Sequence, residues 1–449
     1  MQHEGKRKMS DTEGPDKKES RSREFMREKI VKPPLTKGQI AARAAVFLLA
    51  AAAFGAVSAL SFTAVRTWSE GRWGGDPQKE SAAIEFNRDD PDVQPEESGS
   101  MQASGGAEET VPVDEAVKAY METYEFTSED LKSMYDSVRA VEQQVDHGIV
   151  TVHSGKQQTD LFGNPIETSG YCAGAVIART SSAYIILTRA SAVSQADSIC
   201  VEFFDGTEVP ASVLQNDGVT GMAVIQADAE AVDPELRGEI HVIPLGNSYS
   251  VKTGDFIIGA GAPAGIVHSF EFGAVTYVAR NVPVTDGVTR ILFTDISSSE
   301  EAGTFIMNLN GEIIGWTDNS LKKESSIASE SVMSISDYKG ILEKMTNGVE
   351  PAYFGIKGQE VSEAMQAEGI PRGVYIADAV SGGPAYESGL QNGDIIVRFD
   401  GRDVATLKEL STQIFSVKPG DTAVITVMRK GRDGYTSLEY QVTAGGRQI

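Results

Sequence analysis

The chain is poor in the residues that most often hold metals or form nucleophile–base pairs, with five histidines and two cysteines among 449 residues. These residues show no zinc-type ligand spacing, and no phosphate-cradling loop is present. Cys172 and Cys200 stand within strand-like runs, which argues against a Cys-His nucleophile arrangement. The sequence therefore predicts no metal and no cofactor. A disulfide between the two cysteines and two buried thiols remain equally compatible with it.

Positive charge is scarce outside the N-terminal segment. Residues 1–43 hold twelve Lys and Arg against seven Asp and Glu, which leaves 28 basic and 57 acidic residues in the other 406. Such an acidic body repels nucleic acid. It suits a water-facing protein that meets basic or unfolded clients.

One apolar run is long enough to cross a membrane. Residues 44–65 are 22 consecutive uncharged residues, which at about 1.5 Å each span a hydrocarbon core of about 30 Å. Basic residues gather before this run, so the positive-inside rule predicts a disordered cytoplasmic tail at 1–43 and an extracytoplasmic C-terminal body. A cleaved signal peptide is disfavoured, because the segment before the apolar run is far too long. The sequence thus predicts a single-pass cell-membrane protein whose residues 66–127 form an acidic, flexible linker.

The body has the pattern of a mainly β protein. Residues 128–145 place apolar side chains at helical spacing behind Ser128, which can cap a helix. Many short strand-like runs separated by Gly, Asp and Asn follow. They predict a pair of six-stranded barrels within residues 128–345. Residues 351–445 alternate strand-like and helical stretches and predict a small β-domain with a peptide-sized groove.

An ordered series of segments carries a family resemblance. The runs CAGAVIA, IILTRASAV, GMAVIQAD, IPLGNS and FIMNLNGEIIGW occur in this order, followed by YFGI and GPAYESGLQNGDIIVRFDGRDV. The first group resembles the HtrA/DegP family of trypsin-like serine proteases, and the second resembles a PDZ domain. The resemblance implies a trypsin-like double β-barrel followed by a PDZ domain. It also implies a Ser-His-Asp triad, in which the His takes a proton from the attacking Ser.

The triad residues are not found at the positions that match the family's motifs. Ser191 stands where the family has its His, in Leu187–Val193. Gly221 stands where the family has its Asp, and Ala302 where it has its nucleophile. Asp217 lies close to the Asp position, but the register favours Gly221. Glu300 and Glu301 would put negative charge where the oxyanion forms.

Other serines and histidines offer a second interpretation. Ser297, Ser298 and Ser299 precede Ala302, while His268 lies in a loop before a strand, where a surface imidazole is favoured. These residues do not match the family's triad positions. The sequence therefore predicts a chain that is not an enzyme, and the alternative is an active serine endopeptidase with an unrecognised nucleophile.

The PDZ-like unit keeps its binding residues. The segment Tyr353–Ile356 matches the family's carboxylate-binding loop, whose backbone amides receive a peptide C-terminus. Gly355 gives this turn room, and Leu410 and Ile414 lie one turn apart on the helix that would wall the groove. The predicted peptide-binding residues are Tyr353, Phe354, Gly355, Ile356, Leu410 and Ile414.

The resulting hypothesis is a membrane-anchored HtrA-like pseudoprotease. It would bind peptide C-termini or unfolded proteins in envelope quality control, or scaffold other envelope proteins. A purely structural subunit of a homo- or hetero-trimer is the third possibility, because the resemblance implies trimers.

Overall fold

The computed structural model describes residues 83–91, 126–159, 165–299, 302–318 and 329–447. All of them belong to one compact unit, Glu80–Ile449. The predicted tail at 1–43 and the predicted membrane helix at 44–65 lie outside the described residues. Within the described ranges, no helix is long and apolar enough to span a bilayer.

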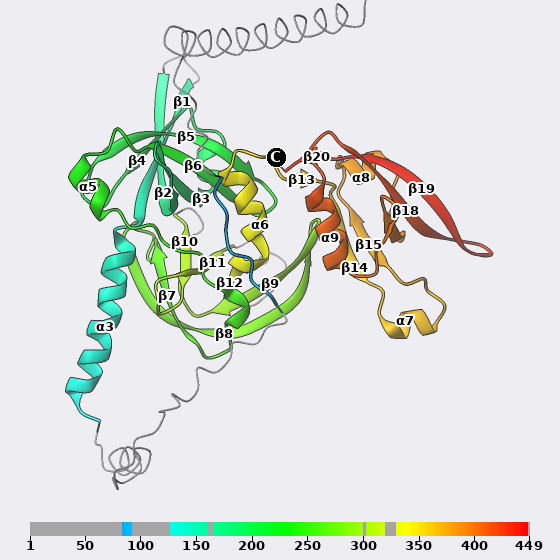
Figure 1. The fold of residues 1–449 in the computed structure, drawn as a ribbon, viewed down its shortest axis with the longest axis horizontal. Helices are drawn as coiled ribbons and strands as arrows, with labels where there is room; N and C mark the ends of the chain where they lie inside the picture. Colours follow the sequence, from blue (N-terminus) through cyan, green and yellow to red (C-terminus); the bar gives the residue numbers. More distant parts are fainter. Residues whose placement is uncertain (1–82, 92–125, 160–164, 300–301, 319–328, 448–449) are drawn as a thin grey trace, which may run out of the picture. The chain divides into compact units, whose positions relative to one another are not determined.

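The first barrel is a closed antiparallel sheet in the order β1-β2-β3-β6-β5-β4 (Figure 1). Its third strand shows why these segments form a barrel core: β-branched and aromatic residues dominate Ala183–Arg189, and five consecutive residues are buried. The strands are β1 Ile149–Thr159, β2 Pro165–Arg179, β3 Ala183–Arg189, β4 Ser198–Glu202, β5 Glu208–Asp217 and β6 Met222–Asp228.

The second barrel is closed as well, in the order β10-β11-β12-β9-β8-β7. Its longest strands, β8 and β9, form a hairpin in which Val284 pairs with Gly287 across a two-residue loop. The strands are β7 Phe256–Gly261, β8 Ser269–Val284, β9 Gly287–Thr294, β10 Thr304–Met307, β11 Ile313–Thr317 and β12 Glu330–Ser334. The predicted double β-barrel is confirmed.

Helices flank the barrels. The predicted first helix is present, but Thr127 rather than Ser128 caps it, in a capping box with Asp130. The helices of this part are α3 Ser128–Asp146, α4 Ala190–Val193, α5 Pro234–Glu239, the 3-10 helix η1 Ser248–Ser250 and α6 Ile335–Thr346.

The C-terminal unit is a sheet in the order β14-β15-β16-β18-β19, with β17 beside β16 and a separate pair β13-β20. Its own core contains Phe354, Phe399 and Ile414, none more than 1 % exposed. The elements are β13 Ala352–Tyr353, β14 Ile356–Glu360, α7 Glu363–Ala367, β15 Val374–Ala379, α8 Pro384–Glu387, β16 Ile395–Phe399, β17 Arg402–Asp403, α9 Leu407–Ser416, β18 Thr422–Gly431, β19 Gly434–Thr443 and β20 Gly445–Gly446.

Part of the predicted linker is bound to the barrel body. Within 66–127, residues 83–91 lie along α6, where Nζ of Lys339 is 2.8 Å from Oδ2 of Asp89. Lys339 is 3 % exposed and Asp89 11 %, so this pair is held away from water. Arg88 adds a bond to Glu343 at 2.8 Å. A flexible linker over the whole interval is therefore wrong for these nine residues, because a buried charge partner holds them.

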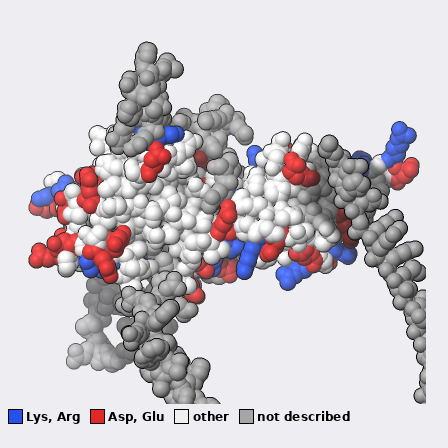
Figure 2. All heavy atoms as spheres, turned by 90° about the horizontal axis from the view of Figure 1, so that it is seen from above, with Lys and Arg blue, Asp and Glu red and all other residues white. Residues whose placement is uncertain are grey.

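Acidic side chains are spread over the surface. On the face seen in Figure 2 they alternate with neutral and basic side chains and form no single large patch. This distribution agrees with the acidic composition of residues 44–449.

Candidate functional site

The structure brings the three expected triad positions to the end of β3, where the two barrels meet. The N–H of Ala190 donates to the carbonyl oxygen of Gly221 at 2.9 Å, and the N–H of Ala173 donates to that of Ala302 at 2.7 Å. Ser191 follows in α4 with an exposed side chain, whereas Ala302 is 4 % exposed. The three positions therefore hold a hydroxyl, a hydrogen atom and a methyl group, and none of these is a general base near neutral pH.

The cationic side chain of Arg189 lies next to Gly303, which follows Ala302 in the chain. A Cβ on Gly303 would lie 3.3 Å from Cδ of Arg189, the last residue of β3. Nε of Arg189 is buried and has no hydrogen-bond partner among the described residues. Glu300 and Glu301, expected to crowd this loop, lie outside the described part of the chain.

Asp217 cannot replace the family's carboxylate, because its oxygens are engaged elsewhere. Its carboxylate accepts from Thr220 Oγ1 at 2.8 Å, from the N–H of Val219 at 3.0 Å and from Nε of Arg447 at 3.0 Å. Asp217 is fully buried.

The alternative serines lie in separate surroundings. Ser297 Oγ donates to Glu271 at 3.3 Å and Ser298 Oγ donates to Glu330 at 2.7 Å. Ser299 Oγ accepts from the N–H of Ala302 at 3.3 Å. A Cβ on Gly265 would lie 4.0 Å from Cβ of Ser299, so this serine flanks the loop between β7 and β8.

The same loop ends in a histidine that is paired with a carboxylate. Nδ1 of His268 lies 2.7 Å from Oδ1 of Asp146, the last residue of α3. His268 takes a positive φ of 64°, which is uncommon for a residue with a Cβ. The expected surface imidazole is therefore only partly exposed and has a fixed partner. Within the described ranges, Ser299 makes no hydrogen bond to His268.

The predicted peptide-binding residues lie together in the C-terminal unit. Phe354, Ile356, Leu410 and Ile414 are at most 1 % exposed and belong to one core cluster, while Tyr353 is half-buried. Gly355 has a φ of 77°, which a residue without a Cβ adopts at little cost. The loop at 353–356 thus has the turn that converging backbone amides require.

These amides already converge on one carboxylate. Oδ2 of Asp286 accepts from the N–H of Phe354 at 2.8 Å and from that of Gly355 at 3.1 Å, and Oδ1 accepts from the N–H of Ile356 at 2.9 Å. Asp286 lies in the loop between β8 and β9 and is fully buried. Burial raises the pKa of its carboxyl group, while the three amides and the charge of Arg447 oppose this rise. No sequence motif marks Asp286, because its partners lie about 70 residues away.

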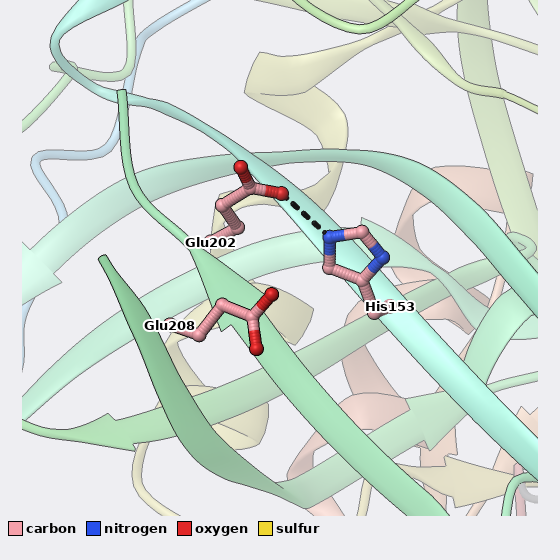
Figure 3. A group of neighbouring side chains, drawn as sticks. All are labelled: His153, Glu202 and Glu208. Atoms are coloured by element: carbon pink, nitrogen blue, oxygen red, sulfur yellow. Dashed lines mark hydrogen bonds and ion pairs between the residues drawn. The ribbon is translucent and has the colours of Figure 1, made fainter. Parts of the chain in front are cut away.

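A third group of side chains could hold a metal ion. His153, Glu202 and Glu208 point toward one another from β1, β4 and β5 (Figure 3), and their ligand atoms lie within 4.8 Å of one another. Nε2 of His153 is 2.7 Å from Oε2 of Glu202. Sequence spacing could not reveal this group, because antiparallel pairing of three strands assembles it.

The two cysteines are free thiols that lie on opposite faces of the same wall of the first barrel. Cys172 pairs with Val152 of β1, and Cys200 pairs with the next residue, His153. Neighbouring residues of a strand face opposite ways, so Cys172 is buried inside while Cys200 is partly exposed. This geometry rules out the disulfide that the sequence left open.

Comparison with known proteins agrees with both halves of this architecture. The trypsin-like peptidase domain family matches residues 172–315, and the PDZ domain family matches residues 352–439. The chain combines a trypsin-like peptidase domain with a PDZ domain, as HtrA/DegP-type proteins do. The predicted PDZ domain and the resemblance to this group are thereby confirmed.

Individual relatives are distant. A probable periplasmic serine endoprotease DegP-like of Hahella chejuensis is 26 % identical over 291 residues, which are 62 % of this chain and 60 % of the relative. The serine protease Do-like HtrA of Bacillus subtilis is 26 % identical over 334 residues, 69 % of this chain and 72 % of the relative. The chain spans only about half to three fifths of several other HtrA/DegP-type relatives.

A solved structure shares the fold. The HtrA-type protease AlgW with decapeptide superimposes with a TM-score of 0.50 at 18 % identity, covering 69 % of this chain and 98 % of that one. At this identity the likeness concerns the fold alone.

The relatives overturn one prediction. The proteins just named are serine endoproteases, so the prediction that this chain is not an enzyme is wrong.

Proposed function

We propose that this chain recognises the C-termini of peptides or unfolded proteins through the 353–356 loop of its PDZ domain. The convergence of three backbone N–H groups on one carboxylate carries this proposal. A peptide C-terminus presents the same chemical group, and backbone amides are a recurring way to capture it. The PDZ match supports the proposal, as does the shared fold of the HtrA-type protease AlgW with decapeptide.

An extended peptide is the proposed ligand, because β14 begins at Ile356 of the loop and α9 packs against this strand. A peptide can add its backbone hydrogen bonds to the edge of β14, as in other complexes formed by strand addition. An apolar last residue is the expected preference, because Phe354 and Ile356 are apolar.

A decapeptide array tests this recognition. Fluorescein-labelled decapeptides that differ in the last residue are titrated against the purified full-length chain, each with a free or an amidated C-terminus. Free carboxylates should bind and amides should lose at least about tenfold in affinity, because amidation removes the charged acceptor. Equal binding of both forms would refute the proposal, as would no binding of any peptide even to a variant that lacks the Asp286 carboxylate.

A second candidate function is serine endopeptidase activity, which the names of the relatives favour. The observation that supports it is the Asp146–His268 pair at 2.7 Å beside the loop that Ser299 flanks. A histidine oriented by a carboxylate is the general-base half of a triad. Ser299 is the candidate nucleophile because it flanks this loop. The missing hydrogen bond between Ser299 and His268, both within the described ranges, agrees with this role, since catalytic hydrogen bonds often tighten only with substrate bound.

Casein cleavage and labelling by a serine-reactive probe test this activity on the full-length chain. Ser299→Ala and His268→Ala should each lower turnover by several orders of magnitude, since loss of a nucleophile or its base costs about 10⁶-fold in another serine protease. Ser297→Ala and Ser298→Ala are matched controls and should stay active. Cleavage that survives Ser299→Ala would exclude this nucleophile.

The apolar run and the names of the relatives support a proposal about location. We infer that residues 44–65 anchor the chain in the cell membrane, with the body outside the cytoplasm. Relatives named periplasmic support the outer location of the body. Protease added to intact cells, or to spheroplasts where an outer membrane is present, should remove residues 116–449. Protection of this part until lysis would reverse the orientation.

Trimer formation, which the resemblance implies, is tested by analytical ultracentrifugation.

A further inference from the structure

We propose that the tip of the β8–β9 hairpin, Thr285 and Asp286, is a built-in ligand of the PDZ groove that an incoming peptide C-terminus must displace. This inference rests on the proposed peptide recognition and adds its regulation. The tip and the peptide compete for the same three amides. The free chain therefore binds peptides more weakly than an emptied groove would.

The carboxylate is the first point of likeness to a bound peptide. Both oxygens of Asp286 are used, by the amides of Phe354, Gly355 and Ile356, at 2.8 to 3.1 Å. Hydrogen bonds to an ionised acceptor are among the strong ones. Asp286 is 0 % exposed, so an external carboxylate cannot reach the amides while it stays in place.

The backbone is the second point of likeness. The N–H of Asp286 donates to the carbonyl oxygen of Ile356 at 2.7 Å, and Thr285 forms an antiparallel bridge with Lys357 of β14. The tip therefore pairs with the strand edge that a peptide would use. On the other wall, a Cβ on Gly287 would lie 2.9 Å from Oγ of Ser411 in α9. The tip thus lies against β14, and the adjoining Gly287 lies against α9.

The backbone of the tip takes an uncommon conformation at Asp286. Asp286 has a φ of 61°, an uncommon conformation that Asp tolerates better than most residues with a Cβ. A second hairpin offers a matched comparison. Asp433 also precedes a glycine, in the exposed two-residue loop between β18 and β19. It has the same local sequence type but no role at the 353–356 loop.

The competing interpretation is a purely structural clasp between the second barrel and the PDZ domain. The two interpretations predict opposite effects of removing the carboxylate. A clasp that does not compete would leave peptide affinity unchanged or reduced. A competitor reduces the apparent affinity by the fraction of molecules in which the groove is open.

The experiment measures binding of the same decapeptide array to the full-length wild type, Asp286→Ala and Asp433→Ala. We expect Asp286→Ala to bind free-carboxylate peptides about tenfold or more tightly than the wild type, because charged hydrogen bonds of this kind no longer oppose the ligand. Asp433→Ala should match the wild type. Equal affinities in all three overturn the inference while leaving peptide recognition standing, whereas absence of binding in all three refutes the recognition itself.

Amide hydrogen exchange tests the contact without any ligand. The amides of Phe354, Gly355 and Ile356 should exchange faster in Asp286→Ala than in Asp433→Ala, because they lose the carboxylate that accepts their hydrogen bonds. Unchanged exchange at these amides overturns the inference whatever the peptides do. Asp286→Asn is the second variant if the alanine variant folds poorly. Its side chain has the same shape but no charge.

An independent observation carries a second proposal. The geometry points to a zinc site formed by His153, Glu202 and Glu208 on the outer face of the first barrel (Figure 3). Strand register puts the three on one face, because Glu202 pairs with Glu208, and His153 pairs with Cys200, two residues before Glu202. Val152 and Val201, their neighbours along the strands, are fully buried on the inner face.

The donor set suits zinc better than the other common ions. Imidazole nitrogen and carboxylate oxygens are zinc ligands, whereas magnesium and calcium favour oxygen alone. A tetrahedral ion with bonds of about 2.0 to 2.1 Å needs ligand atoms about 3.4 Å apart. The three atoms lie within 4.8 Å of one another, and Glu208 is exposed. Cys200 adds a thiol to the same face.

Calorimetric titration of the tag-free full-length chain with zinc chloride tests the site. His153→Gln and the double variant Glu202→Gln with Glu208→Gln should each weaken one zinc-binding event by at least about tenfold, since even outer-shell changes cost about 10- to 100-fold. His241→Gln and Glu235→Gln are matched controls and should not change it. Absence of a zinc-binding event in the wild type, or one that persists in His153→Gln, refutes the site.

Discussion

Arg447 and Asp217 form an ion pair that joins the end of the PDZ domain to the first barrel. Nε of Arg447 lies 3.0 Å from Oδ1 of Asp217, and their side chains are 1 % and 0 % exposed. The carbonyl oxygen of Arg447 also accepts from the N–H of Gly218 at 3.0 Å. The two residues are 230 positions apart, so this pair exists only when both domains are folded together.

Breaking the Arg447–Asp217 pair should strongly destabilise the protein. Arg447→Met leaves a buried carboxylate without its cation, which costs about 3–5 kcal/mol. Urea unfolding at equilibrium measures this change. Arg398→Met is the control, because the pair of Arg398 and Asp403 is exposed and should contribute less than about 1 kcal/mol. Equal losses in both variants would show that the buried pair has no special role.

Gly355 should be required for peptide binding and not only for stability. Gly355→Ala puts a Cβ at a φ of 77° and 3.1 Å from the hydroxyl of Tyr353. Gly393→Ala is the matched control, with a φ of 98° but open space around it. Each variant should lose about 1–2 kcal/mol of stability through backbone strain. Only Gly355→Ala should also lose decapeptide binding, and binding retained there would separate the loop from recognition.

His241 should make the fold sensitive to acid. Burial, and then the nearby His147, lower the pKa of His241 below its ordinary value. The unfolded chain then binds this proton at a higher pH than the folded chain, so stability falls as the pH drops through the ordinary histidine range. His241→Gln removes this group. Thermal unfolding at about pH 7.5 and about pH 5 should show a smaller loss for this variant than for the wild type. An equal loss would assign the acid sensitivity to other groups.

Asp89 should protect the segment at 83–91 from proteolysis. Its carboxylate binds the nearly buried Lys339 at 2.8 Å and accepts from Ser336 Oγ at 2.6 Å. In Asp89→Ala, trypsin should cleave after Arg88 about 10- to 100-fold faster, because the loss of charged hydrogen bonds makes local opening easier. Mass spectrometry of the products measures this rate. Glu85→Gln is the control on the same segment, and equal protection in all three proteins would show that Asp89 does not hold it.

Local patterns predicted most of the fold. Alternating and continuous apolar runs such as Ala183–Arg189 predicted strands, because the residues that a strand buries are close together in the sequence. The tight turn at Gly355 was also expected from the sequence, since a glycine in such a turn is a local requirement. The same reasoning failed for residues 83–91, whose polar composition hides the buried partner that binds them.

The candidate sites depended on contacts that no local pattern encodes. The sequence around His268 predicts a surface residue, whereas α3 places Asp146 against its ring. His153, Glu202 and Glu208 come together only when three strands pair in register. Residue types at motif positions also led to the prediction that the chain is not an enzyme, which the names of its relatives contradict.

The sequence by itself determined the order of the domains, the strand-rich body and the glycine turn at 353–356, since these follow from the periodicity and turn chemistry of neighbouring residues. Only the tertiary structure decided that Asp286 fills that loop, that Arg447 is paired with Asp217 and that His153 faces two glutamates. The physical reason is the same in each case. Closure of a barrel and docking of a domain bring together side chains that are distant in the chain. These side chains attract one another strongly only when folding has brought them within a few ångströms.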